Sequence, residues 1–272
     1  MKRRNPSLII GGILVALVVI MAVVSFFWTP HNPILNDGTA KFAPMWGKYF
    51  LGTDKFGRDE LSRLMLGART TLLVGIVSVS IALIIGVPLG IWSAMSRRVV
   101  GNLVMRGNDL LLAFPALLLA IMLAAIYGSG TVVAMIAIGI ATIPTFARVS
   151  RAGAMQIIQN DYILAARAAG HGKFAIARRH ILPNIGSLVI VQASIAFATA
   201  ILAEAALSYL GLGTPPPNPT WGNMLFDSQD TLYKAVHLGL IPGIAIALAV
   251  LGFNLLGDGL RDRLDATLAD VR

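Results

Sequence analysis

The side chains that could take part in chemistry are few in this sequence and lie far apart. The four histidines show no spacing typical of a metal site: His31, His171, His180 and His237. The chain has no cysteine, and no Ser/His/Asp arrangement is suggested. The phosphate-binding pattern Gly-x-x-x-x-Gly-Lys-Ser/Thr is also absent, because Lys48 and Lys173 follow glycines but precede aromatic residues. We therefore expect a chain that is not an enzyme and holds no metal or nucleotide cofactor itself.

Glu204 differs from the other acidic residues because it lies well inside an apolar run. Ionisable groups inside a membrane are costly and tend to face a cavity or a partner. Two interpretations stay open. Glu204 either contributes a polar group to a translocation path or gate, or its carboxylate bonds to a neighbouring helix. Asp109 and Arg106 lie at the end of another run, where we expect a structural ion pair between them.

The elements that must position these residues are membrane spans. The chain has 272 residues, of which 56% are hydrophobic and 13% charged, whereas soluble domains carry about 25% charged residues. A helical span needs roughly 20 mostly apolar residues, and several such runs occur. The runs do not alternate in period two as barrel strands do. The sequence therefore predicts an all-α, polytopic membrane protein.

Six apolar runs predict six spans, over about 8–28, 70–95, 110–127, 131–147, 188–209 and 236–256. The first run is too long for a signal peptide, so we expect it to be retained. With six spans both termini lie on one side, and 15 of the 22 Lys and Arg residues fall on that side. An excess of basic residues marks the cytoplasmic side. The net charge of +9 then needs no nucleic-acid partner.

Three regions follow from these spans. Residues 1–69 hold the first span and an extracytoplasmic loop, in which 58–66 predicts a short amphipathic helix at the outer membrane surface. Residues 70–258 hold the other spans and a polar cytoplasmic insert at 148–184. Residues 259–272 form a charged cytoplasmic tail. No internal repeat is visible, which weighs against a secondary transporter built from duplicated halves.

The cytoplasmic insert contains a short alanine-rich segment that predicts a helix. Asn160 or Asp161 suits its start, because a side-chain oxygen there accepts backbone N–H bonds. Alanines at 165, 166, 168 and 169 favour helix and keep its surface thin. Gly170 suits a left-handed stop, and Pro183 ends the approach to the next span. Such a helix either lies on lipid or approaches another protein closely, and the pattern alone favours neither.

The same segment resembles the EAA loop of bacterial ABC importer permeases, which are the membrane subunits of these transporters. That loop reads Glu-Ala-Ala, three residues, Gly, nine residues and an Ile-x-Leu-Pro-like ending, and the spacing here matches throughout. The departure is Leu164, where the family usually has Glu for a polar contact. In the family this segment is the coupling helix, which sits in a groove of the ATPase subunit. The resemblance therefore assigns ATPase coupling to Asp161, Leu164, Ala165, Ala166, Arg167, Gly170 and Pro183.

Three further segments resemble one branch of that family, the dipeptide, oligopeptide and nickel permeases. The first is Leu51-Gly52-Thr53-Asp54 with Gly57-Arg58-Asp59. The second runs from Leu207-Ser208-Tyr209 through a triple proline to Trp221-Gly222. The third is the stretch 254–265, although Ala266 stands where Pro is usual. Together the motifs cover the chain nearly end to end.

The resemblance implies a type I ABC importer permease in the bacterial inner membrane that moves di- or oligopeptides. It implies a second related permease, two cytoplasmic ATPases that hold ATP and Mg²⁺, and an extracytoplasmic substrate-binding protein. Within this family, nickel, a metal chelate or glutathione is an alternative substrate. The rival class is an ATP-independent secondary transporter or channel, which would not co-purify with an ATPase.

Overall fold

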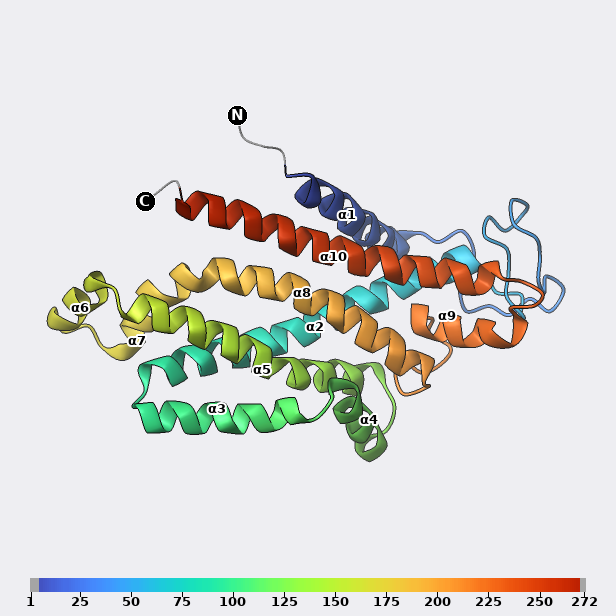
Figure 1. Ribbon diagram of the computed structural model, residues 1–272. Helices are drawn as coiled ribbons and strands as arrows, with labels where there is room; N and C mark the ends of the chain where they lie inside the picture. Colours follow the sequence, from blue (N-terminus) through green and yellow to red (C-terminus); the bar gives the residue numbers. More distant parts are fainter. Residues whose placement is uncertain (1–4, 270–272) are drawn as a thin grey trace.

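The computed structural model describes residues 5–269, and every regular element among them is a helix (Figure 1). The long helices are α1 (Pro6–Phe27), α2 (Glu60–Met95), α3 (Arg98–Ala113), α4 (Ala116–Tyr127), α5 (Thr131–Ile158), α8 (Leu182–Tyr209) and α10 (His237–Ala269). The short ones are α6 (Asp161–Ala168), α7 (Lys173–Ile176), a π-helical turn (Ala177–Ile181), α9 (Trp221–Ser228) and a 3-10 turn (Gln229–Thr231). The all-α prediction is confirmed. The basic start at 2–4 and the last residues of the predicted tail, 270–272, lie outside the described residues.

The described part of the chain contains six candidate membrane spans when a bent pair of helices is counted as one. Five segments are long and apolar enough to span alone: α1, α2, α5, the continuous stretch Lys173–Tyr209, and α10. The sixth consists of α3 and α4, which meet at 79°. The prediction that this span begins at about residue 110 is therefore wrong, because its first helix begins at Arg98. Pro115 explains the break, because it lacks an N–H group and forces Phe114 into an extended conformation.

The predicted separate helix at 58–66 is also wrong, because these residues lead directly into α2. Asp59 caps the helix by accepting a hydrogen bond from the Ser62 backbone N–H at 3.0 Å. The first two turns of α2 place several side chains in the interior rather than on a membrane surface: Glu60, Ser62, Arg63 and Met65. At its other end α2 runs to Met95 with Pro88 inside it.

The two ends of the helix bundle carry different elements (Figure 1). One end, which we call the α6 end, holds the start of α1, the α2–α3 connection, α6, α7 and the end of α10. The opposite end, which we call the α9 end, holds the long loop between α1 and α2, together with α9. The basic loops that are predicted to be cytoplasmic thus gather at the α6 end.

The first and last spans lie against each other along their length (Figure 1). Their approach is close at Gly11, where an added Cβ would lie 2.4 Å from the Leu256 backbone nitrogen. Buried apolar side chains of both helices, including Val18 and Phe253, join one core cluster. The first and last helices of the chain therefore pack against each other within one bundle. The α10 helix continues to Ala269, so the predicted tail begins inside a helix.

Candidate functional site

The short helix α6 has one buried face and one exposed face. Ile163 is 0% exposed and Ala166 8% exposed, and both join a core cluster with Ile176, Ile181 and Ile185. An isolated helix of eight residues is unstable in water, so this contact is what holds α6 in place. The remaining side chains of the helix point outward. The result is a thin surface, firmly attached to the bundle and open to a partner.

The two ends of α6 differ in how well they are capped. Asn160 occupies the N-cap position, but its side chain makes no capping hydrogen bond, so the predicted cap is wrong in that detail. The other end is a Schellman motif, with His171 N–H donating to the Ala166 carbonyl at 3.1 Å and Gly170 N–H donating to the Arg167 carbonyl at 3.0 Å. Gly170 has φ +82°, as the predicted left-handed stop requires.

Most residues assigned to coupling lie together on the exposed side of the α6 end. Asp161, Leu164, Ala165 and Arg167 are exposed on the helix, and Gly170 is exposed directly after it. Ala166 faces inward instead. Pro183 is exposed but lies away from α6 along the chain, in the first turn of α8. Proline is tolerated there because the first N–H groups of a helix lack partners.

Aromatic residues beside α6 extend this surface, and the sequence analysis missed them. Phe174 is 79% exposed and Tyr162 is 43% exposed. The ring of Tyr162 lies 6.0 Å from that of His180, which in turn lies 6.5 Å from the ring of His171. Large exposed apolar side chains gather where proteins meet partners. The signal in the sequence was a phenylalanine in a stretch rich in basic residues, between Lys173 and Arg178.

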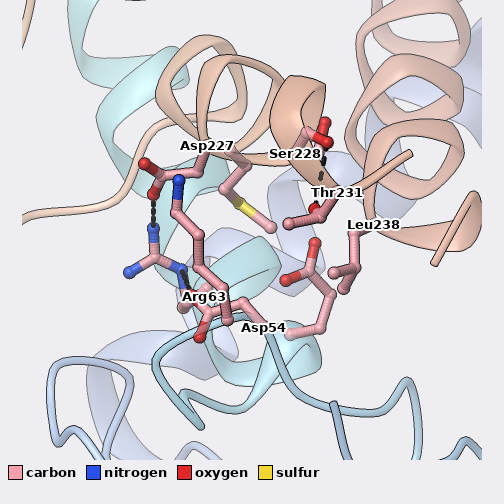
Figure 2. A pocket seen from close by; sticks show the side chains of 9 residues that line it. Asp54, Arg63, Asp227, Ser228, Thr231 and Leu238 are labelled. Atoms are coloured by element: carbon pink, nitrogen blue, oxygen red, sulfur yellow. Dashed lines mark hydrogen bonds and ion pairs between the residues drawn. The ribbon is translucent and has the colours of Figure 1, made fainter. Parts of the chain in front are cut away.

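The α9 end is held together by a partly buried cluster of charged residues. Arg58 Nε lies 2.6 Å from Asp54 Oδ2, and Arg58 Nη2 lies 2.8 Å from Asp227 Oδ2. Arg63 also lies between these two carboxylates, as Figure 2 shows. Because Asp227 belongs to α9 and Asp54 to the long loop, the cluster joins that loop to α9 and α2. The predicted motif around Arg58 thus has a structural role at this end.

Glu204 is buried inside α8, near the C-terminal end of that helix. Its side chain is 1% exposed, and Oε1 accepts a hydrogen bond from the Ser208 hydroxyl at 2.7 Å. Among the described residues, Oε2 has no hydrogen-bond partner. The carboxylate therefore does not reach the surface of this subunit in the conformation described. A role for Glu204 in a path or gate stays a prediction.

Asp109 forms an ion pair, although not with the expected partner. Its Oδ1 lies 2.7 Å from Arg148 Nη2, so the contact joins α3 to α5. The prediction of a pair with Arg106 is wrong. Both charged side chains are more than half exposed, and beside them runs a groove of about 330 Å³ whose lining also includes Met105 and Met155.

The arrangement of spans defines a fold class, which is shared with chains of solved ABC transporters. The fold matches a solved chain of the MetNI methionine ABC transporter in an inward-facing conformation, with a TM-score of 0.60 and 21% sequence identity. The match covers 72% of this chain and 93% of that one. A chain of an amino acid ABC transporter matches with a TM-score of 0.52 and 17% identity, over 75% of this chain and 93% of that one.

The particular family follows from the sequence comparison. Residues 86–270 match the family described as binding-protein-dependent transport system inner membrane component, and the chain belongs to this family. It is thus a multi-pass inner-membrane permease component of an ABC importer and works with other subunits of such a transporter. The resemblance noted in the sequence is confirmed.

Relatives of known name match along almost the whole chain. A di/tripeptide transport system permease protein of Pseudomonas aeruginosa is 42% identical, over 96% of this chain and 89% of its own length. A dipeptide transport system permease protein of Escherichia coli K12 is 42% identical, over 98% and 91%. A glutathione transport system permease protein of Pectobacterium atrosepticum is 38% identical, over 97% and 88%.

Proposed function

We propose that this chain moves di- and oligopeptides across the cytoplasmic membrane, driven by separate ATPase subunits that act on α6. The observation that carries the proposal is the geometry of α6. Ile163 and Ala166 attach the helix to the core of the bundle, whereas Ala165 and Leu164 leave its other side open. A partner that pulls or pushes this surface displaces the core helices with it.

The proposed complex contains this chain, a second related permease, two ATPases and an extracytoplasmic substrate-binding protein. ATP and Mg²⁺ bind to the ATPases, and this chain contributes no catalytic residue. The α6 end then faces the cytoplasm with both termini, and the α9 end faces outward. The excess of basic residues in the loops at the α6 end supports this orientation.

Peptides are the proposed substrate because the relatives named above carry di- and tripeptide transport in their names. Glutathione is a second candidate, supported by the relative at 38% identity. Glutathione is itself a tripeptide, so both candidates are small peptides with free carboxylates. Competition between a labelled dipeptide and glutathione for uptake distinguishes them.

The mechanism that we propose is a shift between two conformations. A nucleotide shifts the permease only if the contacts that ATPases make with α6 differ between the two states. Couplings of this kind typically amount to about 1–3 kcal/mol, or roughly 5- to 150-fold in an equilibrium constant. A surface of a few small residues in close contact is enough for such a difference.

The experiment is the substitution Ala165→Glu, which adds a bulky charge to the exposed face of α6 without touching its buried face. We expect the variant to insert normally but to lose ATPase binding and uptake in proteoliposomes. Asn218→Glu is the matched control, since it adds the same charge to an exposed position in the proline-rich loop near α9. It is expected to leave co-purification of the ATPases unchanged. Normal ATP-driven uptake by Ala165→Glu would refute the coupling role.

A further inference from the structure

Two exposed polar contacts join α3 to α5 near the α6 end. Arg148 Nη2 donates to Asp109 Oδ1 at 2.7 Å, and Arg151 Nη2 donates to Asn102 Oδ1 at 2.9 Å. The later residue of α3 pairs with the earlier residue of α5, as antiparallel helices require. The two contacts are therefore successive links along one line between the helices.

A third polar contact between the two helices is buried. Asn108 is 4% exposed, and its Nδ2 donates to the Pro144 carbonyl at 3.1 Å. At the start of α3 the Ser93 hydroxyl of α2 donates to the Gly101 carbonyl at 2.9 Å. α3 is thus hydrogen-bonded to α2 through Ser93 and to α5 through a series of polar side chains.

Apolar packing between α3 and α5 is incomplete beside these links. The groove of about 330 Å³ separates them there, lined by Met105, Asp109, Arg148, Arg151, Ala152 and Met155. The ion pair at its edge is 54–60% exposed on its two side chains, and ion pairs that exposed stabilise a fold little. The ion pair therefore adds little to the stability of the fold, and the role to consider is its effect on how α3 and α5 move relative to each other.

α5 and α3 connect to different elements of the structure. α5 ends at Ile158 and only two residues separate it from α6, so a displacement of α6 reaches α5 directly. α3 ends at the break before Pro115 and continues into α4 at 79°. In Figure 1, α3 and α4 lie on the outside of the bundle, beneath α5. The polar links thus connect α5 to α3, the first helix of the bent span, whereas α4 packs on α5 through apolar side chains such as Ala120.

We propose that Asp109 and Arg148, with Asn102 and Arg151, are positioning residues that make α3, the first helix of the bent span, move with α5 when α6 is displaced. The inference rests on the proposed function, because it needs an ATP-driven displacement of α6. In this mechanism the links stay formed through the transport cycle. They carry α3 as a rigid extension of α5 and pivot it about its attachment to α2 near Gly101.

Charge reversal tests the ion pair. In proteoliposomes that contain the assembled transporter, Asp109→Arg and Arg148→Asp are each expected to lower peptide imported per ATP hydrolysed by about 5-fold or more. The double variant, which restores the pair with its charges exchanged, is expected to recover most of the loss. ATPase binding to α6 should be unchanged in all three variants. Normal transport in the single variants, or a double variant no better than either single variant, would overturn the proposal.

Cross-linking provides a test that does not depend on the charged pair. The chain has no cysteine, so Asn102→Cys with Arg151→Cys creates one defined pair in this subunit, which a short bis-maleimide can join. We expect reduced coupling before the reagent and recovery after it, because the covalent bridge replaces the polar link. The unmodified transporter with the same reagent is the control. Transport that falls further after cross-linking would show that α3 and α5 must separate, and the proposal would be wrong.

The outcomes also separate this inference from the function on which it rests. If Ala165→Glu abolishes ATP-driven uptake while the α3–α5 variants transport normally, the coupling surface stands and the links are irrelevant. If the unmodified transporter imports no peptide when ATP is supplied, the proposed function fails first.

Discussion

Ile163 is the residue on which the attachment of α6 depends most, and Ile163→Ala should detach the helix locally. The side chain is fully buried against the core. The substitution removes three carbon groups, and at about 0.8 kcal/mol for each this amounts to about 2.4 kcal/mol. Buried Ile→Ala substitutions cost about 2–5 kcal/mol once the cavity is included. A short helix has little stability of its own to offset this loss.

Hydrogen–deuterium exchange of the α6 amides measures the effect directly. A local loss of about 2.4 kcal/mol corresponds to roughly 50-fold faster exchange, since each 1.4 kcal/mol is a factor of ten. The informative amides are those of Ala169, Gly170 and His171, which bond back to α6. We expect faster exchange there and, in the assembled transporter, ATP hydrolysis that no longer drives uptake.

Leu164→Ala is the matched control, because Leu164 is the next residue and is 54% exposed. Its exchange rates should stay within a few-fold of those of the unmodified protein, since exposed substitutions usually change stability by less than about 0.5 kcal/mol. Equal protection of α6 in Ile163→Ala and in the unmodified protein would refute the argument that burial of this side chain holds the helix.

Two further predictions concern the α9 end and the closure of the bundle. Asp227→Ala removes one of the two carboxylates, Asp54 and Asp227, that pair with Arg58 and Arg63. It should destabilise the loop at the α9 end by about 1–3 kcal/mol, which limited proteolysis detects as faster cleavage within 31–59. Unchanged cleavage would contradict this role. Gly11→Leu should force α1 away from α10 at a cost of about 1–3 kcal/mol, seen as a lower thermal unfolding temperature in detergent. Gly12→Leu meets no atom within 4 Å of its Cβ and should unfold as the unmodified protein does.

Hydropathy predicted the number of spans but not where the helices end. The apolar run ends at about residue 147, whereas α5 continues to Ile158. In the same way α2 begins at Glu60, before its apolar run starts. Hydrophobicity reports the thickness of the membrane, while the end of a helix depends on caps and backbone bonds. The links between α3 and α5 involve a residue beyond the apolar run, Arg151, and were missed for that reason.

Residues within one or two turns were enough to predict α6, whereas contacts between distant parts of the chain could not be predicted from the sequence. The alanines and Gly170 act within one or two turns of the chain, and the structure contains the helix and its left-handed stop. The partner of Asp109, by contrast, lies 39 residues away. Arg106 is nearer in sequence, since residues three apart lie on one helical face. No pattern in the sequence shows that α5 brings a stronger partner to the same place.

The continuity of the chain after α7 changes how the buried Glu204 is understood. The sequence predicted a loop that Pro183 ends, but the π-helical turn joins α7 to α8 and the helical stretch runs from Lys173 to Tyr209. Pro183 lies inside this stretch, shortly after the π-helical turn, and does not end it. One continuous helical stretch thus begins beside α6 and ends at the turns that hold Glu204. The stretch thus joins the α6 end to the α9 end without an intervening loop, and Glu204, bonded to Ser208, lies near its far end.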